Sequence, residues 1–410
     1  MSPMGQSCSV ETPPGSTFAS DSYIDTVENR AQERNVLPSA VVPGSVLDVA
    51  TSRYSAPRTV YCSSDIKCLA RLDWPLAAAN PSKAQAQTQA KQPVLFNGHT
   101  KAVNRLFVDG KRGHIWSVSR DLSVKQWLAS NDDNTASGEC LQTFSDAHEL
   151  NLTAVAMDEE GNGEYVYTGS RDYSVKQWDV SAGKCVTTFA QPRNIVTALN
   201  VGSTGHGISA GLLYQASEDL KVRVWDPRVG GTSSHAQPAA ELTGFVYFAL
   251  CMDIHSNGFN LATGCKGFNS VGCEMKLGDL RYPTKPVCEG RRHSQDVTAC
   301  KFIESTSTTR SSSSSSSSLC ASCCKDGSVR LWDVNSGGEL LEEVAMLSTS
   351  KYVYMYMNVC VCFCVCSSPA LLPPTLTNSS PLFFYTKGTT RPSRGCGRRR
   401  RRRGSQIARR

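Results

Sequence analysis

An aspartate followed six residues later by a tryptophan recurs along this chain at intervals of roughly fifty residues. The four complete copies are Asp121 with Trp127, Asp172 with Trp178, Asp219 with Trp225, and Asp326 with Trp332. Two further segments read as degenerate copies, one with Arg71 six residues after Asp65 and one with Gly278 in the tryptophan place. A period of this length indicates one supersecondary unit used many times, and such a unit buries a core only by packing against its neighbours.

The copy around Trp178 indicates how each unit folds. Short β-rich runs occupy residues 153–157, 165–168, 175–178 and 185–189. Turn-forming residues separate them, as expected for four antiparallel strands. Small sheets of this kind close their faces by stacking around a ring. We therefore expect an all-β fold, a β-propeller with six readable blades and disordered tails at both ends.

A second set of residues completes the repeat. A histidine precedes the first strand of three units, at His99, His148 and His293. With these histidines and the Trp-Asp endings at 178–179, 225–226 and 332–333, the chain resembles the WD-repeat superfamily. The resemblance implies a buried hydrogen-bond chain in each blade, from the histidine through the repeat aspartate and tryptophan to a hydroxyl of the second strand, at Ser117, Thr168 or Ser322. Buried polar groups of this kind are tolerated when each is satisfied, so their implied role is to hold the blade.

The region from Val46 to Val344 resembles one branch of that superfamily in particular. The most specific segment is a glycine-rich turn at residues 264–274, where a short Ser-x-Asp turn is usual, and residues 193–197 stand in place of a Gly-His start. This resemblance implies seven blades and allows a role in trafficking or ciliary complexes. Two insertions, at residues 77–92 and 305–318, depart from the branch.

The charge of the chain is concentrated at one end. The net charge is +7, yet residues 346–410 contain twelve Lys and Arg and no Asp or Glu, which leaves 31 basic and 36 acidic residues elsewhere. The basic pI is therefore no evidence that the propeller binds nucleic acid. We predict three parts: a flexible leader at 1–45, the propeller at 46–345, and a low-complexity tail at 346–410.

The tail has a composition of its own. Alternating Val and Cys at residues 359–366 is what a translated GT repeat produces, and six arginines follow at 398–403. Our hypothesis is that much of residues 346–410 is translated intron or another gene-model error. If the tail is real, its arginine run favours an alternative function, an RNA-associated propeller.

The N-terminal sequence matches a lipidation pattern. Residues 4–9 fit M-G-x-x-x-[ST], which makes Gly5 a myristate acceptor if translation begins at Met4, and Cys8 a palmitate acceptor behind it. One acyl chain binds a membrane reversibly, and two bind it stably. The alternative is a chance match in a flexible leader. With thirteen cysteines scattered outside the tail and no apolar secretory signal, we expect a cytoplasmic protein that is membrane-associated or ciliary.

Basic residues stand immediately before three of the repeat aspartates. These are Arg120, Arg171 and Lys325, while Glu218 takes the same place before Asp219. We expect Arg193 and Lys266 near the same rim. Together the five basic residues form a candidate patch for an acidic peptide, and the alternative is a ring of ordinary solvated turn residues.

The sequence offers no catalytic constellation. A catalytic site needs a nucleophile, a base and a stabilising group in one pocket, and the repeat itself accounts for three of the seven histidines. We predict no catalytic residue, no metal and no cofactor. The expected function is a non-enzymatic scaffold whose partners are other proteins or peptides, with nucleic acid an improbable partner of the propeller.

Overall fold

The structure is a computed structural model of the whole chain. It describes residues 45–51, 59–73, 93–129, 138–190, 194–203, 209–229, 237–282, 286–303, 319–335, 339–346 and 384–385. No helix within these ranges has the length and apolar character that a membrane span requires.

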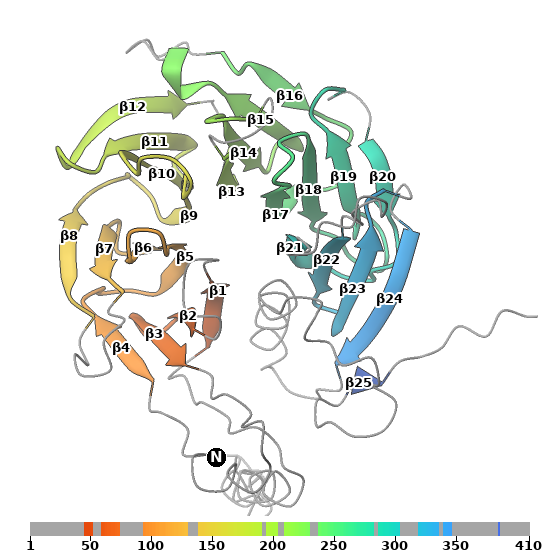
Figure 1. Cartoon of the computed structure of the whole chain (residues 1–410), viewed down its shortest axis with the longest axis horizontal. Helices are drawn as coiled ribbons and strands as arrows, with labels where there is room; N and C mark the ends of the chain where they lie inside the picture. The colour runs from red at the N-terminus through yellow and green to blue at the C-terminus, as the bar shows by residue number, and fades with distance from the viewer. Residues whose placement is uncertain are drawn as a thin grey trace, which may run out of the picture.

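The described strands form six antiparallel sheets arranged as the blades of a ring (Figure 1). Blade 1 contains β1 (Val46–Ala50), β2 (Thr59–Ser64), β3 (Cys68–Asp73) and β4 (Val94–Asn97). Blade 2 contains β5 (Val103–Asp109), β6 (His114–Ser119), β7 (Val124–Leu128) and β8 (Cys140–Phe144). Blade 3 contains β9 (Leu152–Met157), β10 (Tyr165–Ser170), β11 (Ser174–Asp179) and β12 (Lys184–Ala190).

The second half of the ring repeats this order. Blade 4 contains β13 (Val196–Val201), β14 (Leu213–Ser217), β15 (Lys221–Trp225), the 3-10 turn η1 (Pro227–Val229) and β16 (Ala240–Leu242). Blade 5 contains β17 (Ala249–Ile254), β18 (Asn260–Cys265), β19 (Met275–Asp279) and β20 (Pro286–Gly290). Blade 6 contains β21 (Val297–Ile303), β22 (Leu319–Cys324), β23 (Ser328–Asp333) and β24 (Glu339–Met346), and β25 (Phe384–Tyr385) pairs with β24.

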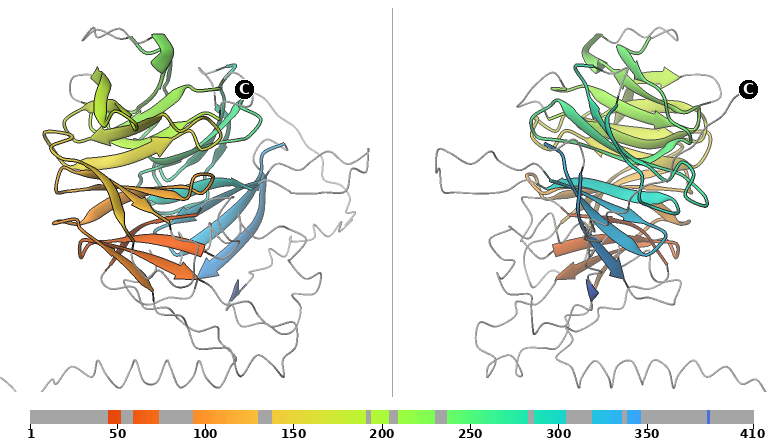
Figure 2. Two further views of the ribbon diagram at one scale, coloured as in Figure 1. Left: turned by 60° about the vertical axis from the view of Figure 1, so that its left-hand side comes forward. Right: turned by 90° about the vertical axis from the view of Figure 1, so that its right-hand side faces the viewer.

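The all-β propeller expected from the repeat is confirmed. The first strand of each blade lies nearest the centre, and the blades stack with sheet face against sheet face (Figures 1 and 2). Backbone groups of these inner strands also bond to the preceding blade: Leu106 N–H donates to Asp48 at 3.0 Å, and Phe302 N–H donates to Asp253 at 2.8 Å. The seventh blade implied by the resemblance is not among the described residues, which form six.

Apolar side chains join each blade to the next. Five buried clusters each contain residues of two successive blades, from blades 1 and 2 through to blades 5 and 6. Between blades 2 and 3, Phe144 lies stacked between Trp116 (6.0 Å between ring centroids) and Trp178 (5.1 Å). Two further clusters belong to one blade each, around Val60 in blade 1 and around Val329 in blade 6.

The strand register corrects our interpretation of blade 1. Leu72 pairs with Val60 as Trp127 pairs with Ile115, so the tryptophan place belongs to Leu72 and not to Arg71. Ile66 correspondingly occupies the aspartate place, because its N–H bonds to Ser64 Oγ as Asp121 N–H bonds to Ser119 Oγ. Asp65 and Arg71 are thus six residues apart, as in the repeat, but each lies one position before the aspartate or tryptophan place. Gly278 does occupy the tryptophan place of blade 5, where it pairs with Leu261.

Candidate functional site

One face of the ring carries the turn between the second and third strands of every blade. In each blade the first turn residue donates its backbone N–H to a carbonyl at the entrance of the first strand. The pairs are Asp65 to Ser45 (3.0 Å), Arg120 to Ala102 (3.0 Å), Arg171 to Asn151 (3.1 Å), Glu218 to Ile195 (3.0 Å), Lys266 to Phe248 (2.9 Å) and Lys325 to Asp296 (3.0 Å). We call the surface formed by these turns and entrance loops the tetrad face.

Blades 2 and 3 each contain the complete hydrogen-bond chain of four polar residues, which we call the tetrad, beneath this face. His99 Nδ1 lies 2.9 Å from Asp121, and its Nε2 lies 2.8 Å from Ser117 Oγ, which also accepts from Trp127 Nε1 at 2.8 Å. Blade 3 repeats these distances at 2.9, 2.8 and 2.9 Å with His148, Asp172, Thr168 and Trp178. Both histidines are buried, so their ring nitrogens depend on the neighbouring residues of the tetrad for hydrogen bonds.

Blade 6 has the same chain with a cation inserted. His293 Nε2 and Trp332 Nε1 each lie 2.7 Å from Ser322 Oγ, but His293 Nδ1 is 3.7 Å from Asp326. The guanidinium of Arg330 bonds both His293 and Asp326. His293, Cys324 and Asp326 have metal-ligating atoms within 4.8 Å of one another, yet Cys324 holds the place of Ser119 and bonds a backbone carbonyl. The positive charge of Arg330 is already among them, so we assign the group to the blade's structure.

Blade 4 uses an ion network in place of the histidine. Arg223 donates to both carboxylate oxygens of Asp219, at 3.1 and 2.5 Å. With its amide nitrogen facing Asp219, the buried Asn194 donates to the same carboxylate at 2.6 and 3.0 Å. Trp225 Nε1 donates to Gln215 Oε1 at 2.7 Å instead of to a hydroxyl. Asp219 and Trp225 thus occupy their repeat places but belong to two separate bonded groups.

Blade 5 lacks the polar chain. Counted from the strand pairing, Phe245 stands where blade 2 has His99, Gly267 where it has Asp121, and Gly278 where it has Trp127. The ammonium of Lys276 lies over the Phe245 ring, 5.2 Å from its centroid, and 3.1 Å from Glu289. A cation–π contact and an ion pair therefore replace the histidine–aspartate bond.

A basic residue two positions before the tryptophan place recurs in these five blades. The residues are Lys125, Lys176, Arg223, Lys276 and Arg330. The last three are buried, and they are the ones that compensate for a missing or altered histidine–aspartate pair. Sequence reasoning missed Asn194, Gln215 and these cations. For the cations a usable signal was present, namely their constant position two residues before the tryptophan place.

The aspartates of the polar chains make the fold sensitive to acid. Burial raises the pKa of Asp172, but hydrogen bonds from His148 and Ser174 outweigh burial and hold that pKa well below its usual range. The same balance lowers the pKa values of Asp121 and Asp326. A carboxylate whose folded pKa is depressed contributes stability above its unfolded pKa and loses it as the pH falls through the folded pKa.

We therefore expect the free energy of unfolding to fall as the pH is lowered from about 5 to about 2, because these three carboxylates must then bind protons. Urea unfolding at a series of pH values measures this slope. Asp172→Asn should flatten it, and Asp146→Asn, at an exposed site in the loop before blade 3, should leave it unchanged. Equal slopes for Asp172→Asn and the unmodified protein would contradict the assignment.

The candidate basic residues occupy equivalent positions on the tetrad face but do not form one continuous set. Around the ring the first turn residues are Asp65, Arg120, Arg171, Glu218, Lys266 and Lys325, and all six are exposed. The four cations therefore form two sectors, one on blades 2 and 3 and one on blades 5 and 6, with an anion on blade 4 and another on blade 1. Arg193 lies outside the described residues, as do Gly5 and Cys8.

Two of the four cations already have partners. Lys325 Nζ lies 2.5 Å from Asp296, and the Lys266 ammonium lies over the Phe248 ring, 5.0 Å from its centroid. Arg120 Nε donates to Asn104 at 3.0 Å, which leaves its charge uncompensated by that contact. Blades 2 and 3 are therefore the better candidate for an exposed, positively charged sector of the tetrad face.

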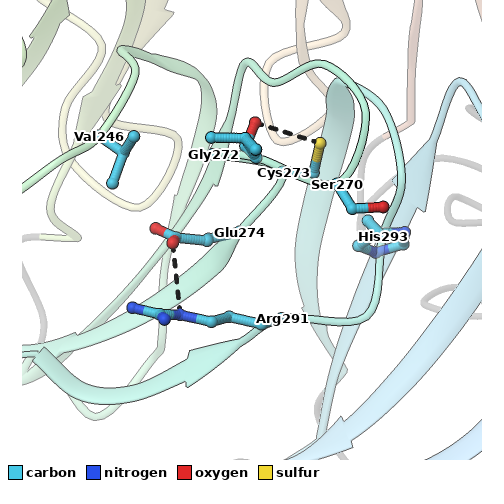
Figure 3. Close-up of a pocket in the computed structure, with 8 residues that line it drawn as sticks. Val246, Ser270, Gly272, Cys273, Glu274, Arg291 and His293 are labelled. Atoms are coloured by element: carbon cyan, nitrogen blue, oxygen red, sulfur yellow. Dashed lines mark hydrogen bonds and ion pairs between the residues drawn. The ribbon is translucent and has the colours of Figure 1, made fainter.

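The tetrad face is hollowed beside blade 5. A pocket of about 240 Å³ lies between the entrance loops of blades 5 and 6 and the turn that joins β18 to β19 (Figure 3). Its lining residues are Val246, Ser270, Val271, Gly272, Cys273, Glu274, Arg291 and His293. Glu274 forms the polar side of the pocket and pairs with Arg291 at 3.3 Å.

Comparison with known protein families identifies the repeat. The model described as "WD domain, G-beta repeat" matches residues 138–179 and 284–333. Each match begins at the outer strand of one blade and ends with the third strand of the next, with its histidine and aspartate on the tetrad face. These two segments are WD40 repeats. Propellers built from WD40 repeats generally bind other proteins and are typically non-enzymatic. In agreement with this, the side chains of each complete tetrad hydrogen-bond to one another and stabilise their blade.

Curated relatives share parts of this WD40 region. The chain is 31% identical over 159 residues to "Ribosome biogenesis protein WDR12 homolog" of Oryza sativa subsp. japonica, covering 34% of this chain and 35% of that protein. It is 30% identical over 169 residues to "Mitochondrial division protein 1" of Kluyveromyces lactis, covering 35% and 23%. It is 32% identical over 101 residues to "Eukaryotic translation initiation factor 3 subunit I" of Meyerozyma guilliermondii, covering 25% and 26%. The chain thus spans about a third or less of the length of these relatives.

Proposed function

We propose that this WD40 propeller is a non-enzymatic scaffold that binds partner proteins through the tetrad face. The observation that carries the proposal is the exposed pair Arg120 and Arg171 on adjacent blades, at equivalent positions of turns that are held by the same backbone bond. Rigid turns present their side chains at little entropic cost, and binding residues concentrate on such loops. The partner that suits this sector is an acidic peptide segment.

Reversing the charge of this sector tests the proposal. We expect Arg120→Glu with Arg171→Glu to weaken partner capture by about tenfold or more, because attraction to an acidic segment becomes repulsion. The measurement is quantitative affinity capture from cell extract with the full chain as bait. The matched control is Lys111→Glu, which reverses a charge in the turn at the opposite end of β5 and β6. Identical partner profiles for the double variant and the control would refute a role for Arg120 and Arg171.

The site of action is a further part of the proposal. The glycine-rich turn at residues 264–274 and the Met-Gly pair at residues 4–5 support placing the chain with the subfamily of WD repeat-containing protein 31. We propose accordingly that translation begins at Met4 and that acylation at Gly5 and Cys8 tethers the scaffold to a membrane, within trafficking or ciliary complexes.

A second function is favoured by the names of two relatives, which concern ribosome biogenesis and translation initiation. In that alternative the propeller is RNA-associated through the arginine run at residues 398–403, which lies outside the described residues. Loss of the captured partners after ribonuclease treatment would favour this alternative over direct protein binding.

A further inference from the structure

The turn between β18 and β19 of blade 5 differs from its equivalents in length and shape. It spans residues 266–274, whereas the same turn in blade 2 spans only residues 120–123. Phe268 and Val271 exchange two backbone hydrogen bonds, each of 3.0 Å, around Asn269 and Ser270. Both of these central residues have positive φ angles, 49° and 64°, as in a type I′ hairpin turn. The segment is therefore a small hairpin, and we call it the blade 5 hairpin.

The blade 5 hairpin is anchored at its tip and at its base. Ser270 N–H donates to the Ser294 carbonyl at 3.0 Å, and Gly267 N–H donates to Asp296 at 2.9 Å. Gly272 has a φ of 73°, and a Cβ there would lie 2.1 Å from the Tyr247 ring, so only glycine lets Tyr247 pack against the hairpin. These contacts hold the hairpin against the entrance loops of blades 5 and 6.

Apolar side chains nevertheless point from this rigid segment into solvent. Phe268 is 71% exposed and Val271 is 55% exposed. Val246 and Tyr247 are also exposed on the adjoining entrance loop, and Val246 lines the pocket together with Val271. Single exposed apolar residues are ordinary, but four on this hairpin and the adjoining loop, two of which line the pocket, indicate an interaction site.

The charged residues around this apolar group differ in exposure, with the basic side chains exposed and the acidic ones less so. Lys266, Arg291 and Arg292 are exposed. The neighbouring acids Glu274 and Asp296 are buried, Glu289 is half-buried, and each of the three is paired with a basic side chain. An approaching molecule therefore meets apolar and cationic side chains first, which favours a partner that is apolar and acidic.

The pocket itself fits one side chain. Its volume of about 240 Å³ lies below the roughly 300–1,000 Å³ that is usual for pockets that hold a whole small molecule. Glu274 is buried within it, and both of its carboxylate oxygens face cations, Oε1 at 3.3 Å from Arg291 Nε and Oε2 at 3.4 Å from Lys276 Nζ. The polar wall of the pocket is therefore neutralised, which suits an apolar occupant.

We propose that the blade 5 hairpin and its pocket bind a short acidic peptide segment of a partner protein, with one large apolar side chain in the pocket. Phe268 and Val271 cover that side chain, while Arg291 and Lys266 face the acidic residues that flank it. This proposal rests on the proposed function and names a second binding sector, on blades 5 and 6, with a defined class of partner.

The test uses the purified full chain and two synthetic libraries of ten-residue peptides. One library places a single Leu or Phe among Asp and Glu, and the other places it among Lys and Arg. We expect binding to the acidic library alone, and Phe268→Ser with Val271→Ser should weaken it at least about tenfold. Val246→Asp, at the pocket wall, should weaken it similarly. The control is Val229→Ser, which removes an exposed valine (80%) in η1, outside the hairpin and the pocket.

The outcomes separate this proposal from the proposed function. All substituted residues are exposed, so an unchanged unfolding midpoint confirms that the variants fold. Equal binding of both libraries, or equal affinities of the hairpin double variant and Val229→Ser, would overturn the proposal. Binding of a labelled single-stranded oligonucleotide in preference to the acidic library would overturn it too. If the Arg120 and Arg171 reversal abolishes partner capture while the hairpin variants bind normally, the proposed function stands and this inference fails.

Discussion

Replacing Trp178 by alanine should lower the free energy of unfolding by about 3–5 kcal/mol. The Trp178 ring is buried, and it stacks on Phe144 of the neighbouring blade with an interplanar angle of 11°. Its Nε1 donates to Thr168 Oγ1 at 2.9 Å. The substitution therefore opens a cavity at the interface of two blades and removes a buried hydrogen bond. Urea denaturation followed by circular dichroism measures the loss.

A conservative variant separates the two causes. Trp178→Phe retains an aromatic ring against Phe144 but removes the N–H donor, so it should cost about 1–3 kcal/mol. If Trp178→Phe costs as much as Trp178→Ala, the loss comes from the hydrogen bond within blade 3 and not from stacking across the interface. A cost below about 1 kcal/mol for the alanine variant would contradict both contributions.

Replacing Arg223 by alanine should also be costly, roughly 2–4 kcal/mol, because it removes a buried side chain and leaves the half-buried Asp219 carboxylate without its cation. The Arg223 side chain is only 5% exposed, and Asp219 and Asn194 both bond to its guanidinium. Removing the cation leaves the Asp219 carboxylate with a neutral amide as its remaining partner. Thermal and urea unfolding of the variant measure the effect.

The matched control for Arg223 lies on the same strand. Lys221 pairs with Glu241 at 2.6 Å, and Arg223 contacts the same Glu241 at 3.2 Å, but the Lys221 side chain is 38% exposed. Lys221→Ala should therefore cost less than about 1 kcal/mol, as exposed ion pairs do. Equal costs for the two substitutions would show that the network of blade 4 contributes no more than a surface ion pair.

Sequence periodicity predicted the architecture because each blade repeats one pattern of strands and turns. The runs expected at 153–157 and 175–178 are β9 and β11 to within one residue at either end. Spacing alone misplaced blade 1, since Asp65 and Arg71 imitate the repeat while the aspartate and tryptophan places hold Ile66 and Leu72. An apolar substitute leaves no polar signature, so only strand pairing shows which residue stands in the place.

The candidate site was less accessible from sequence, because its character depends on contacts between distant residues. Nothing in the sequence indicates that Lys325 is paired with Asp296, or that Lys266 lies over Phe248. The unusual length of the turn at 264–274 was visible, but the exposure of Phe268 was not. A phenylalanine in a glycine-rich segment reads as a buried anchor until the hairpin geometry shows that it points outward.

The apolar clusters shared by successive blades form the packed connection between the two basic sectors of the tetrad face. Each shared cluster connects only successive blades, so the described interfaces act as a series of nearest-neighbour couplings. A partner that docks on the blade 5 hairpin is separated from Arg171 on blade 3 by the whole of blade 4. Within the described residues, the shared clusters connect the two sectors through that blade. The network of Arg223 and Asp219, which replaces the histidine chain there, therefore lies on the packed route between them.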